Sequence, residues 1–579
     1  MLPYTLTSPF SFRGPPWLLV VFLVLASHRG QAQAPSWQSA VAFSQASTSA
    51  SQVQATAVDA NGDVYLAGGF IGTASFGAIA LTSAGNRDVF VAKWSPASNT
   101  FAWAVQAGGL ESERAMALVV NGPSVYIAGA FESTATFGAT TLVSAGQSDA
   151  FVAKLTDAGR SASFTWAVQA GGPDVDRATG VAVSGANVYL TGYYYGATAR
   201  FGATTLANAG RSADAFVAKI TDAGPTGGFT WVQPMGGTDF DLASAVAVRG
   251  TSVYVAGTTV SPTARFGPLT FPTAGQSDAF VTKLTDAGPT GSFAWVQPIS
   301  GPGYEQADAL AVGGTAVYVT GSTSSATPAF GPLALTSASP GSTVFVAKLA
   351  DSGGTGRFAW AQLAGSATAA LAQGMAVQGT DVYVCGHFYG TATFGGSTLT
   401  SATAGARTML ADLFVAKLTD AGPTGRFVWG QRAGGPNNAE ATAIAADGAN
   451  VYVGGTVYPP TSFGGLLIAQ PAGNYVGVLA VLADNTALAT AAAVPLWGVS
   501  LAPNPAHAPA TVRVPPVAGA AQVGVTLRDG LGRVVYQDTW ALPPAGLSHE
   551  LPVAGIPGGV YLLQLQAGTA KAVRRLVVE

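Results

Sequence analysis

The sequence has few of the residues that carry nucleophilic or metal chemistry. Its 579 residues include one cysteine and four histidines, and only 9 % of all residues are charged. The single cysteine, Cys385, excludes an intrachain disulfide and a cysteine-based zinc cluster. With so few histidines, neither a Ser-His-Asp triad nor a histidine-rich metal site is expected. We interpret Cys385 as a small apolar core residue, because it follows Val-Tyr-Val in a strand-like run.

Positive charge is also scarce, whereas apolar residues and glycine are abundant. There are 26 lysines and arginines against 29 acids, for a net charge of −3. Nucleic acids bind clustered lysines and arginines, so no nucleic-acid partner is expected. The chain is 48 % hydrophobic and 10 % aromatic, with 74 glycines. This composition favours turn-rich β-structure and argues against disorder.

The longest apolar run stands near the N-terminus. Residues 17–26 are uniformly apolar, Arg13 precedes them, and Ala32-Gln33-Ala34 follows. Ten residues are too few to cross a membrane as a helix, which needs about 20, but they suit the apolar region of a secretory signal peptide. We predict a signal peptide over residues 1–34, cleaved after Ala34 during export through the inner membrane. No membrane span is expected in the mature form.

The middle of the chain repeats one unit seven times. Val-Tyr, followed by an aliphatic residue, a small residue and Gly, recurs at spacings of 61 to 69 residues. Each unit also carries Phe-Gly, Phe-Val-Ala-Lys and Phe-x-Trp elements or their variants. Thr-Asp-Ala-Gly joins the third and fourth strand-like runs of several units, and we interpret its aspartate as a turn former. The repeated tyrosines are Tyr65, Tyr126, Tyr189, Tyr254, Tyr318, Tyr383 and Tyr452.

These units predict an all-β ring. Strands that are apolar on both faces belong in sheets stacked between other sheets. The last unit lacks its tryptophan strand, whereas Trp37 has no unit before it. We therefore predict a seven-bladed β-propeller over residues 35–485, in which the N-terminal strand completes the last blade. An extra hairpin or loop is expected at each Phe-Gly element, on one face. A string of separate small sandwiches is the alternative, weakened by the marginal core of a unit this small.

The Val-Tyr-x-x-Gly, Asp-Ala-Phe-Val-Ala-Lys-Leu and x-Trp elements resemble bacterial β-propeller repeats of the SBBP type. That resemblance implies the propeller fold and an extracytoplasmic setting more than any activity. The seventh unit departs from the pattern at Val478, where we place the missing lysine.

Residues 486–499 are expected to be a linker, and residues 500–579 a small Ig-like β-sandwich, because short strands alternate with glycine-rich turns. Four motifs of this segment, taken in order, resemble the type A C-terminal sorting domain of the type IX secretion system. The resemblance implies two partners, the outer-membrane translocon and the sorting peptidase, and a protein that is secreted or attached to the cell surface. The motif residues are Pro503, Asn504, Pro505, Asp529, Gly530, Gly532, Arg533, Gly559, Tyr561 and Arg575.

Five acids stand twelve or thirteen residues before a repeated tyrosine. In a ring they would project from equivalent loops, near the central channel on one face. Such acids either bind a cation such as calcium, bind sugar hydroxyls, or cap their own loops by accepting backbone N–H groups. No other cofactor is expected. The candidate residues are Glu113, Asp176, Asp241, Glu305 and Glu440.

Two functions fit this sequence. The first is an exported, non-catalytic scaffold that binds a glycan, a protein or a surface through its loop face. The alternative is an extracellular polysaccharide-active enzyme that uses two carboxylates as acid and base. We favour the scaffold and assign no catalytic residue, because the sequence supplies a ring of similar acids without an insertion that would build a one-sided active site.

Overall fold

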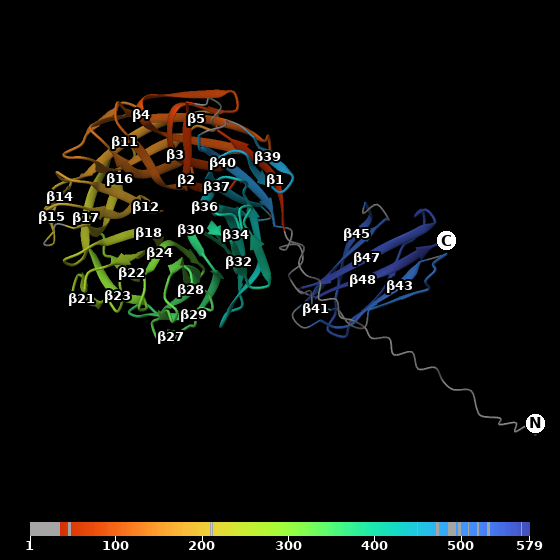
Figure 1. Ribbon diagram of the computed structural model, residues 1–579. Coiled ribbons are helices and arrows are strands. Elements are labelled where there is room, and N and C mark those ends of the chain that lie inside the picture. Colours follow the sequence, from red (N-terminus) through yellow and green to blue (C-terminus); the bar gives the residue numbers. More distant parts are fainter. Residues whose placement is uncertain are drawn as a thin grey trace, which may run out of the picture.

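All regular structure in the described part of the chain is β-strand, as predicted (Figure 1). The computed structural model describes residues 35–579 apart from 44–47, 209, 211, 449, 470–473, 485–493, 496–498, 508, 518–519, 530–532 and 569. The predicted signal peptide with Ala34, most of the predicted linker, and Gly530 and Gly532 lie outside the described residues. Within the described part, no helix is long and apolar enough to cross a membrane.

Strands β1–β40 include seven antiparallel sheets, each with a core of four strands that covers one sequence repeat. The fourth strand of sheets 1–5 is extended by a hairpin from the following repeat. Sheet 1 contains β2 (Ala50–Val58), β3 (Val64–Phe76), β4 (Ile79–Ser95), β5 (Thr100–Gly109), β8 (Thr134–Phe137) and β9 (Thr140–Val143). Sheet 2 contains β6 (Glu113–Asn121), β7 (Ser124–Phe131), β10 (Asp149–Asp157), β11 (Ala162–Gly171), β14 (Thr198–Phe201) and β15 (Thr204–Ala207). Sheet 3 contains β12 (Asp176–Ser184), β13 (Asn187–Tyr194), β16 (Asp214–Asp222), β17 (Gly227–Gly236), β20 (Thr263–Phe266) and β21 (Leu269–Pro272).

The remaining sheets repeat this order with small differences at the end of the series. Sheet 4 contains β18 (Asp241–Arg249), β19 (Ser252–Thr259), β22 (Asp278–Asp286), β23 (Gly291–Ser300), β26 (Ala329–Phe330) and β27 (Leu333–Ala334). Sheet 5 contains β24 (Glu305–Gly313), β25 (Ala316–Thr323), β28 (Thr343–Asp351), β29 (Gly356–Ser366), β32 (Thr391–Phe394) and β33 (Ser397–Thr400). Sheet 6 contains β30 (Ala369–Gln378), β31 (Asp381–Tyr389), β34 (Asp412–Asp420) and β35 (Gly425–Ala433); β38 (Thr461–Phe463) and β39 (Leu466–Ile468) form a separate hairpin. Sheet 7 contains β36 (Ala439–Asp447), β37 (Asn450–Val457), β40 (Val476–Ala483) and β1 (Ser36–Ala42).

The extra hairpin predicted at each Phe-Gly element is present in most repeats, but it does not stand on one face. In the third repeat, Phe201 at the end of β14 pairs with Ala170 of β11, so the hairpin extends the outer edge of the preceding sheet. Gly202 makes the turn with a φ of +59°, a conformation that L-residues with side chains rarely adopt. The buried Phe201 ring then packs 4.7 Å from the ring of Phe216.

The first and last strands of the repeat region pair with each other. Trp37 of β1 lies opposite Leu482 of β40, and the Phe43 N–H donates to the Gly477 carbonyl at 3.0 Å. This is the pairing predicted for the Trp37 strand. Tyr452 lies opposite Val481, whereas Tyr65 lies opposite Lys93. The lysine position of the last repeat is therefore Val481, and placing it at Val478 was wrong by three residues.

The sheets follow one another around a common centre (Figure 1). Each innermost strand contacts the innermost strand of the next sheet, and β36 of sheet 7 contacts β2 of sheet 1. A central cavity of about 200 Å³ is lined by residues from all seven innermost strands. Seven hydrophobic clusters lie between neighbouring sheets, including one in which Tyr452 and Leu479 pack with Leu66 and Phe90.

A buried polar contact joins neighbouring sheets beside these clusters. Between sheets 2 and 3, the Asp222 carboxylate accepts from Tyr126 Oη at 2.6 Å, Lys154 Nζ at 2.7 Å and Trp166 Nε1 at 3.1 Å. We call this arrangement the clamp. Asp222 also accepts from the Gly224 N–H at 2.9 Å, so it forms its own turn, as predicted, and also binds the preceding sheet. The aspartates that accept from a tyrosine and a lysine of the preceding sheet are Asp157, Asp222, Asp286, Asp351, Asp420 and Asp484.

The junction between sheets 7 and 1 is built differently. Tyr452 donates to Asp447 of its own sheet at 3.1 Å, and its ring meets the edge of Trp94 at 6.3 Å. Because the lysine position holds Val481, apolar and aromatic packing replaces the clamp at this junction.

The C-terminal segment forms two further sheets around one shared hydrophobic core. All five strands that the sequence predicts here match observed strands to within three residues at either end, whereas three further short strands were not predicted. The predicted ranges are Ala510–Val514, Gln522–Arg528, Arg533–Thr539, Val560–Gln566 and Val573–Val578. One sheet contains β41 (Val494–Pro495), β44 (Gln522–Arg528), β45 (Val534–Ala541), β47 (Gly559–Ala567) and β48 (Ala570–Val578). The other contains β42 (Ser500–Ala502), β43 (Ala510–Val514) and β46 (Leu547–Leu551).

Candidate functional site

Four of the five candidate acids share one position, the first residue of an innermost strand, and we call them the strand-start acids. Their side chains are buried, with at most 1 % of each residue exposed. Three accept the backbone N–H four residues earlier, at 2.9 Å for Glu113, 2.6 Å for Asp176 and 2.7 Å for Asp241. Glu305 accepts from the Thr323 hydroxyl at 2.8 Å instead. These contacts are those of the capping role, and they keep the carboxylates away from the channel surface.

Glu440 does not belong to this set, although its spacing suggested that it did. Glu440 pairs with Thr456 in β37, whereas Glu113 pairs with Phe131 in β7. Glu440 is therefore equivalent to Arg114 of sheet 2, and Ala439 occupies the strand-start position of sheet 7. The spacing was one residue shorter in the last repeat, and a shift of one residue moves a strand side chain to the opposite face.

Each strand-start acid lies beside an aspartate of the preceding sheet that the sequence analysis missed. A Cβ on Gly108 would stand 2.6 Å from both the Asp88 carboxyl carbon and Glu113 Oε2, so the two carboxyl groups meet there. The available signal was the acid that precedes several Phe-Val-Ala-Lys elements. The four pairs are Asp88 with Glu113, Asp149 with Asp176, Asp214 with Asp241, and Asp278 with Glu305.

Burial raises the pKa of the acids in these pairs, and each pair lacks an ion-paired cation among the described residues. The pKa of Glu113 rises to about 8, first through burial and then through the charges of Asp88 and Glu132. The pKa values of Asp176 and Asp214 rise to about 7 for the same main reason. Such acids hold a proton near neutral pH. The described residues contain no group of three or more His, Cys, Asp or Glu that could hold a metal ion.

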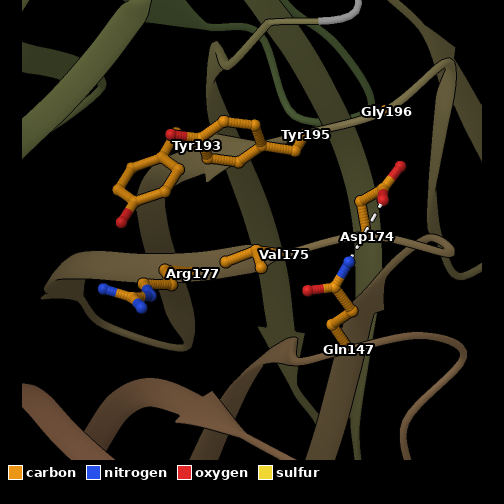
Figure 2. Close-up of a pocket in the computed structure, with 7 residues that line it drawn as sticks. All are labelled: Gln147, Asp174, Val175, Arg177, Tyr193, Tyr195 and Gly196. Carbon is orange, nitrogen blue, oxygen red and sulfur yellow. Dashed lines mark hydrogen bonds between the residues drawn. The ribbon is translucent and has the colours of Figure 1, made fainter.

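A surface pocket of about 420 Å³ is lined by Val175 and Arg177, the chain neighbours of the strand-start acid Asp176 (Figure 2). Arg177 and Tyr193, which lie opposite each other in β12 and β13, stand on one side of it, and Asp174 and Gln147 stand on the other. Gln147 Nε2 lies 3.5 Å from Asp174 Oδ1. The pocket lining is Gln147, Asp174, Val175, Arg177, Tyr193, Tyr195 and Gly196.

Asp176 holds the backbone of the pocket residue Tyr195 in place. Its Oδ1 accepts a hydrogen bond from the backbone N–H of Tyr195 at 3.2 Å, and its Oδ2 accepts one from the Gly172 N–H at 2.6 Å. The Tyr195 ring meets the edge of Tyr193 at 5.9 Å and the edge of Phe240 at 6.2 Å. Phe240 is 45 % exposed, so the aromatic group continues to the surface. The pocket therefore combines a cation, an acid, an amide and partly exposed aromatic rings, the residue types of a binding site for a polar ligand.

The repeats carry different residues at the pocket position, which makes this face asymmetric. The residue after the strand-start position is Arg114 in sheet 2, Arg177 in sheet 3, Leu242 in sheet 4 and Glu440 in sheet 7. In sheet 6 the buried His387 occupies the position of Tyr193, and its ring meets Tyr389 at 5.8 Å. Burial lowers the pKa of His387, while the charge of Glu440 raises it.

The motif residues of the C-terminal segment hold its two ends together. Asn504 Nδ2 donates to the Arg575 carbonyl at 2.6 Å, and Asn504 Oδ1 accepts the Val577 N–H at 2.8 Å. Asp529 accepts from the backbone N–H and the Nε of Arg533, and the buried Tyr561 donates to the Pro557 carbonyl. The motif thus fixes a turn, an aromatic anchor and the last strand.

The comparisons with known proteins identify this segment. The model of the secretion system C-terminal sorting domain matches residues 500–579. The prediction of a type IX sorting domain is confirmed, and it indicates an exported protein that interacts with the secretion machinery. No curated protein matches the chain. A crystal structure of a protein of unknown function from Dyadobacter fermentans is similar over 78 % of this chain and 100 % of its own, with 11 % identity and a TM-score of 0.34.

Proposed function

We propose that the protein is an exported, non-catalytic seven-bladed β-propeller that binds an extracellular ligand through the pocket face, which we call the strand-start face. The seven sheets, the pairing of β1 with β40 and the cavity lined by all seven innermost strands support a closed ring. The repeats are of the SBBP type in this proposal. The match of residues 500–579 to the sorting domain supports type IX delivery after export by a signal peptide over residues 1–34.

One observation carries the binding role, the pocket formed by Arg177, Tyr193, Tyr195 and Asp174. It is open, lined by polar and aromatic groups, and placed at a position where the residues differ between repeats. A position that differs between similar repeats is not fixed by the packing that all the repeats share, so its residues can serve binding instead. The ligand is a glycan, a protein or a cell surface.

The alternative, a polysaccharide-active enzyme, needs two carboxyl groups that reach the substrate. The acid pairs have suitably raised pKa values, but the strand-start acids are at most 1 % exposed. A substrate bound in the pocket would contact Asp174 rather than Asp176. The buried pairs therefore favour the scaffold over the enzyme.

Glycan and protein arrays probed with the mature chain, residues 35–579, test the binding role. We expect binding that Tyr195→Ala weakens and that Arg200→Ala, an exposed arginine of the β14 hairpin, leaves unchanged. Incubating the bound glycan with the protein and measuring released reducing ends tests the enzyme. Release of product would overturn the non-catalytic role.

Cells expressing the whole chain, compared with cells expressing a chain that ends at residue 499, test delivery. We expect the whole chain at the cell surface or in the medium and the shortened chain in the periplasm. Equal surface delivery of both chains would overturn the role of the sorting domain.

A further inference from the structure

Three arginines from neighbouring sheets lie on the strand-start face. Arg114 and Arg177 are the second residues of β6 and β12 in sheets 2 and 3, and Arg87 lies in the middle of β4 in sheet 1. Burial lowers the pKa of Arg114, and the charges of Arg87 and Arg177 lower it further. The backbone geometry agrees with this, because Arg87 pairs with Ser112, two residues before Arg114, and the strands β6 and β12 that carry Arg114 and Arg177 are neighbours.

The Arg87 side chain is largely buried and held in a fixed position. Its side chain crosses Gly69, where a Cβ would stand 2.6 Å from Arg87 Cδ, so only glycine leaves this path open. Arg87 is 8 % exposed, and its Nη2 donates to the Tyr475 hydroxyl at 2.7 Å. The guanidinium is thus held in place across the boundary between sheets 1 and 7 rather than left in bulk water.

These arginines lack close acidic partners. The ion pairs between described residues include none of Arg87, Arg114 and Arg177. The Glu132 carboxylate acts on Arg114 only as the weakest of several charges. A cluster of like charges with open donors is stabilised when an anion binds between them.

Aromatic rings flank the arginine cluster on both sides. Tyr193 and Tyr195 adjoin Arg177, and Tyr475 receives Arg87 and packs 5.6 Å from Tyr458. Tyrosine rings present apolar faces to the C–H faces of sugars and hydroxyl groups to their oxygens. Asp174 and Gln147 add acceptors for sugar hydroxyls at the far side of the pocket.

We propose that the ligand of this face is an anionic polysaccharide whose carboxylate or sulfate groups bind Arg87, Arg114 and Arg177 while its sugar rings lie against the tyrosines. This inference rests on the proposed binding function and names its ligand class. An acceptor such as Asp174, across the pocket from Arg177, suits a polymer that carries both acids and hydroxyls. The acid excess of the whole chain opposes the denser charge of a nucleic acid.

Calorimetric titration of the mature chain with polygalacturonate and with its methyl-esterified form tests the proposal. The two polymers differ in their carboxylates, so we expect binding of the acid form and at least tenfold weaker binding of the ester. Dextran sulfate against dextran separates sulfate from carboxylate recognition. Affinity should fall as salt rises from 50 to 500 mM, since salt screens these charges.

Variants assign the effect to this face. Arg114→Ala and Arg177→Ala are each expected to weaken binding of the acidic polymer roughly tenfold, the loss of one charge-assisted hydrogen bond. Arg200→Ala, an exposed arginine on the outer hairpin, is the matched control and should leave binding unchanged. Circular dichroism and thermal midpoint verify that each variant remains folded.

The outcomes separate the two proposals. Equal binding of the acid and ester forms, weakened by Tyr195→Ala, would overturn the anionic ligand and keep the binding face. Binding of polyglutamate but of no polysaccharide would replace the glycan with an acidic protein. Loss of affinity with Arg200→Ala equal to that with Arg177→Ala would overturn the assignment to this face. Failure to bind any polysaccharide or arrayed protein would overturn both proposals.

Discussion

Sheets 2–5 bury carboxylates at both ends, in opposite chemical settings. At one end, the clamp aspartates meet a lysine, a tyrosine and, in most junctions, a tryptophan of the preceding sheet. At the other end, the strand-start acids meet a second acid and backbone N–H groups. Burial penalises a lone charge at either end, but only the clamp supplies a countercharge.

The pKa values show this difference. Burial alone would raise the pKa of Asp222, but hydrogen bonds from Lys154, Tyr126, Gly224 and Trp166 outweigh it and lower the pKa below its usual range. Burial raises the pKa of Glu113 to about 8, with one backbone hydrogen bond opposing it. The clamp joins neighbouring sheets at six junctions through the same aspartate, tyrosine and lysine positions. The strand-start end varies between sheets, which is where a binding face can differ from its scaffold.

Removing a clamp aspartate should have the largest effect. Asp286→Ala would leave Lys219, Tyr189 and Trp231 buried without their shared acceptor. We expect the free energy of unfolding in urea to fall by about 3–5 kcal/mol, the usual cost of leaving one member of a buried ion pair. The double variant Lys219→Met with Asp286→Leu is the matched control and should recover much of that loss. A loss below about 1 kcal/mol in the single variant would show that the clamp does not hold the sheets.

The sequence revealed the repeats, the strands and the pairing of the Trp37 strand, because each left a signal at a fixed spacing along the chain. Asp222 shows the limit of this reasoning. The Thr-Asp-Ala-Gly motif predicted its turn. Its hydrogen bonds with Tyr126, Lys154 and Trp166, however, join residues 56 to 96 positions apart. Only the order of sheets in space brings those residues together.

The candidate site was predicted less well. The spacing found the strand-start acids but not whether their side chains reach solvent, because burial depends on how neighbouring sheets pack. Glu440 was misplaced because one residue fewer in a strand changes the face of its side chain. The pocket at Arg177, Tyr193 and Tyr195 left no repeated signal at all, since it consists of departures from the repeat.

Trp37→Ala should weaken the junction between sheets 6 and 7, where β1 completes sheet 7. Trp37 meets the edge of Phe463 at 5.1 Å, and its Nε1 donates to the Arg432 carbonyl at 3.1 Å. Because the ring is half-buried, we expect a loss of about 2 kcal/mol, below the 3–5 kcal/mol typical of a fully buried tryptophan. A lowered thermal midpoint in a single transition would support the closing role of β1. Gln38→Ala, exposed on the same strand, is the control, and an equal midpoint for both variants would contradict that role.

Glu113→Gln should remove part of the pH dependence of the free energy of unfolding. The pKa of Glu113 rises from 4.5 to about 8 in the folded state, so the stability from its bound proton is fully present below about pH 4.5 and is lost as pH rises towards 8. The variant keeps a neutral side chain, so we expect it to match the parent at pH 5 and to gain on it by about 1 kcal/mol for each pH unit up to pH 8. Glu111→Gln changes an exposed neighbouring acid and should show no such crossover. A parent protein that is more stable at pH 8 than Glu113→Gln would place a cation, not a proton, between Asp88 and Glu113.

Calcium should have the smallest effect on stability. Adding it tests directly whether a proton or a cation neutralises the Asp88 and Glu113 pair. Each strand-start pair supplies two carboxyl groups, whereas calcium takes six to eight oxygen ligands. Since burial already favours protonation of Glu113, we expect 5 mM calcium at pH 7 to leave the thermal midpoint of the mature chain unchanged. A rise of several degrees that Glu113→Gln abolishes and Glu111→Gln retains would instead identify Asp88 and Glu113 as calcium ligands. That result would make the strand-start end a second set of charge-paired junctions and remove the contrast with the clamp.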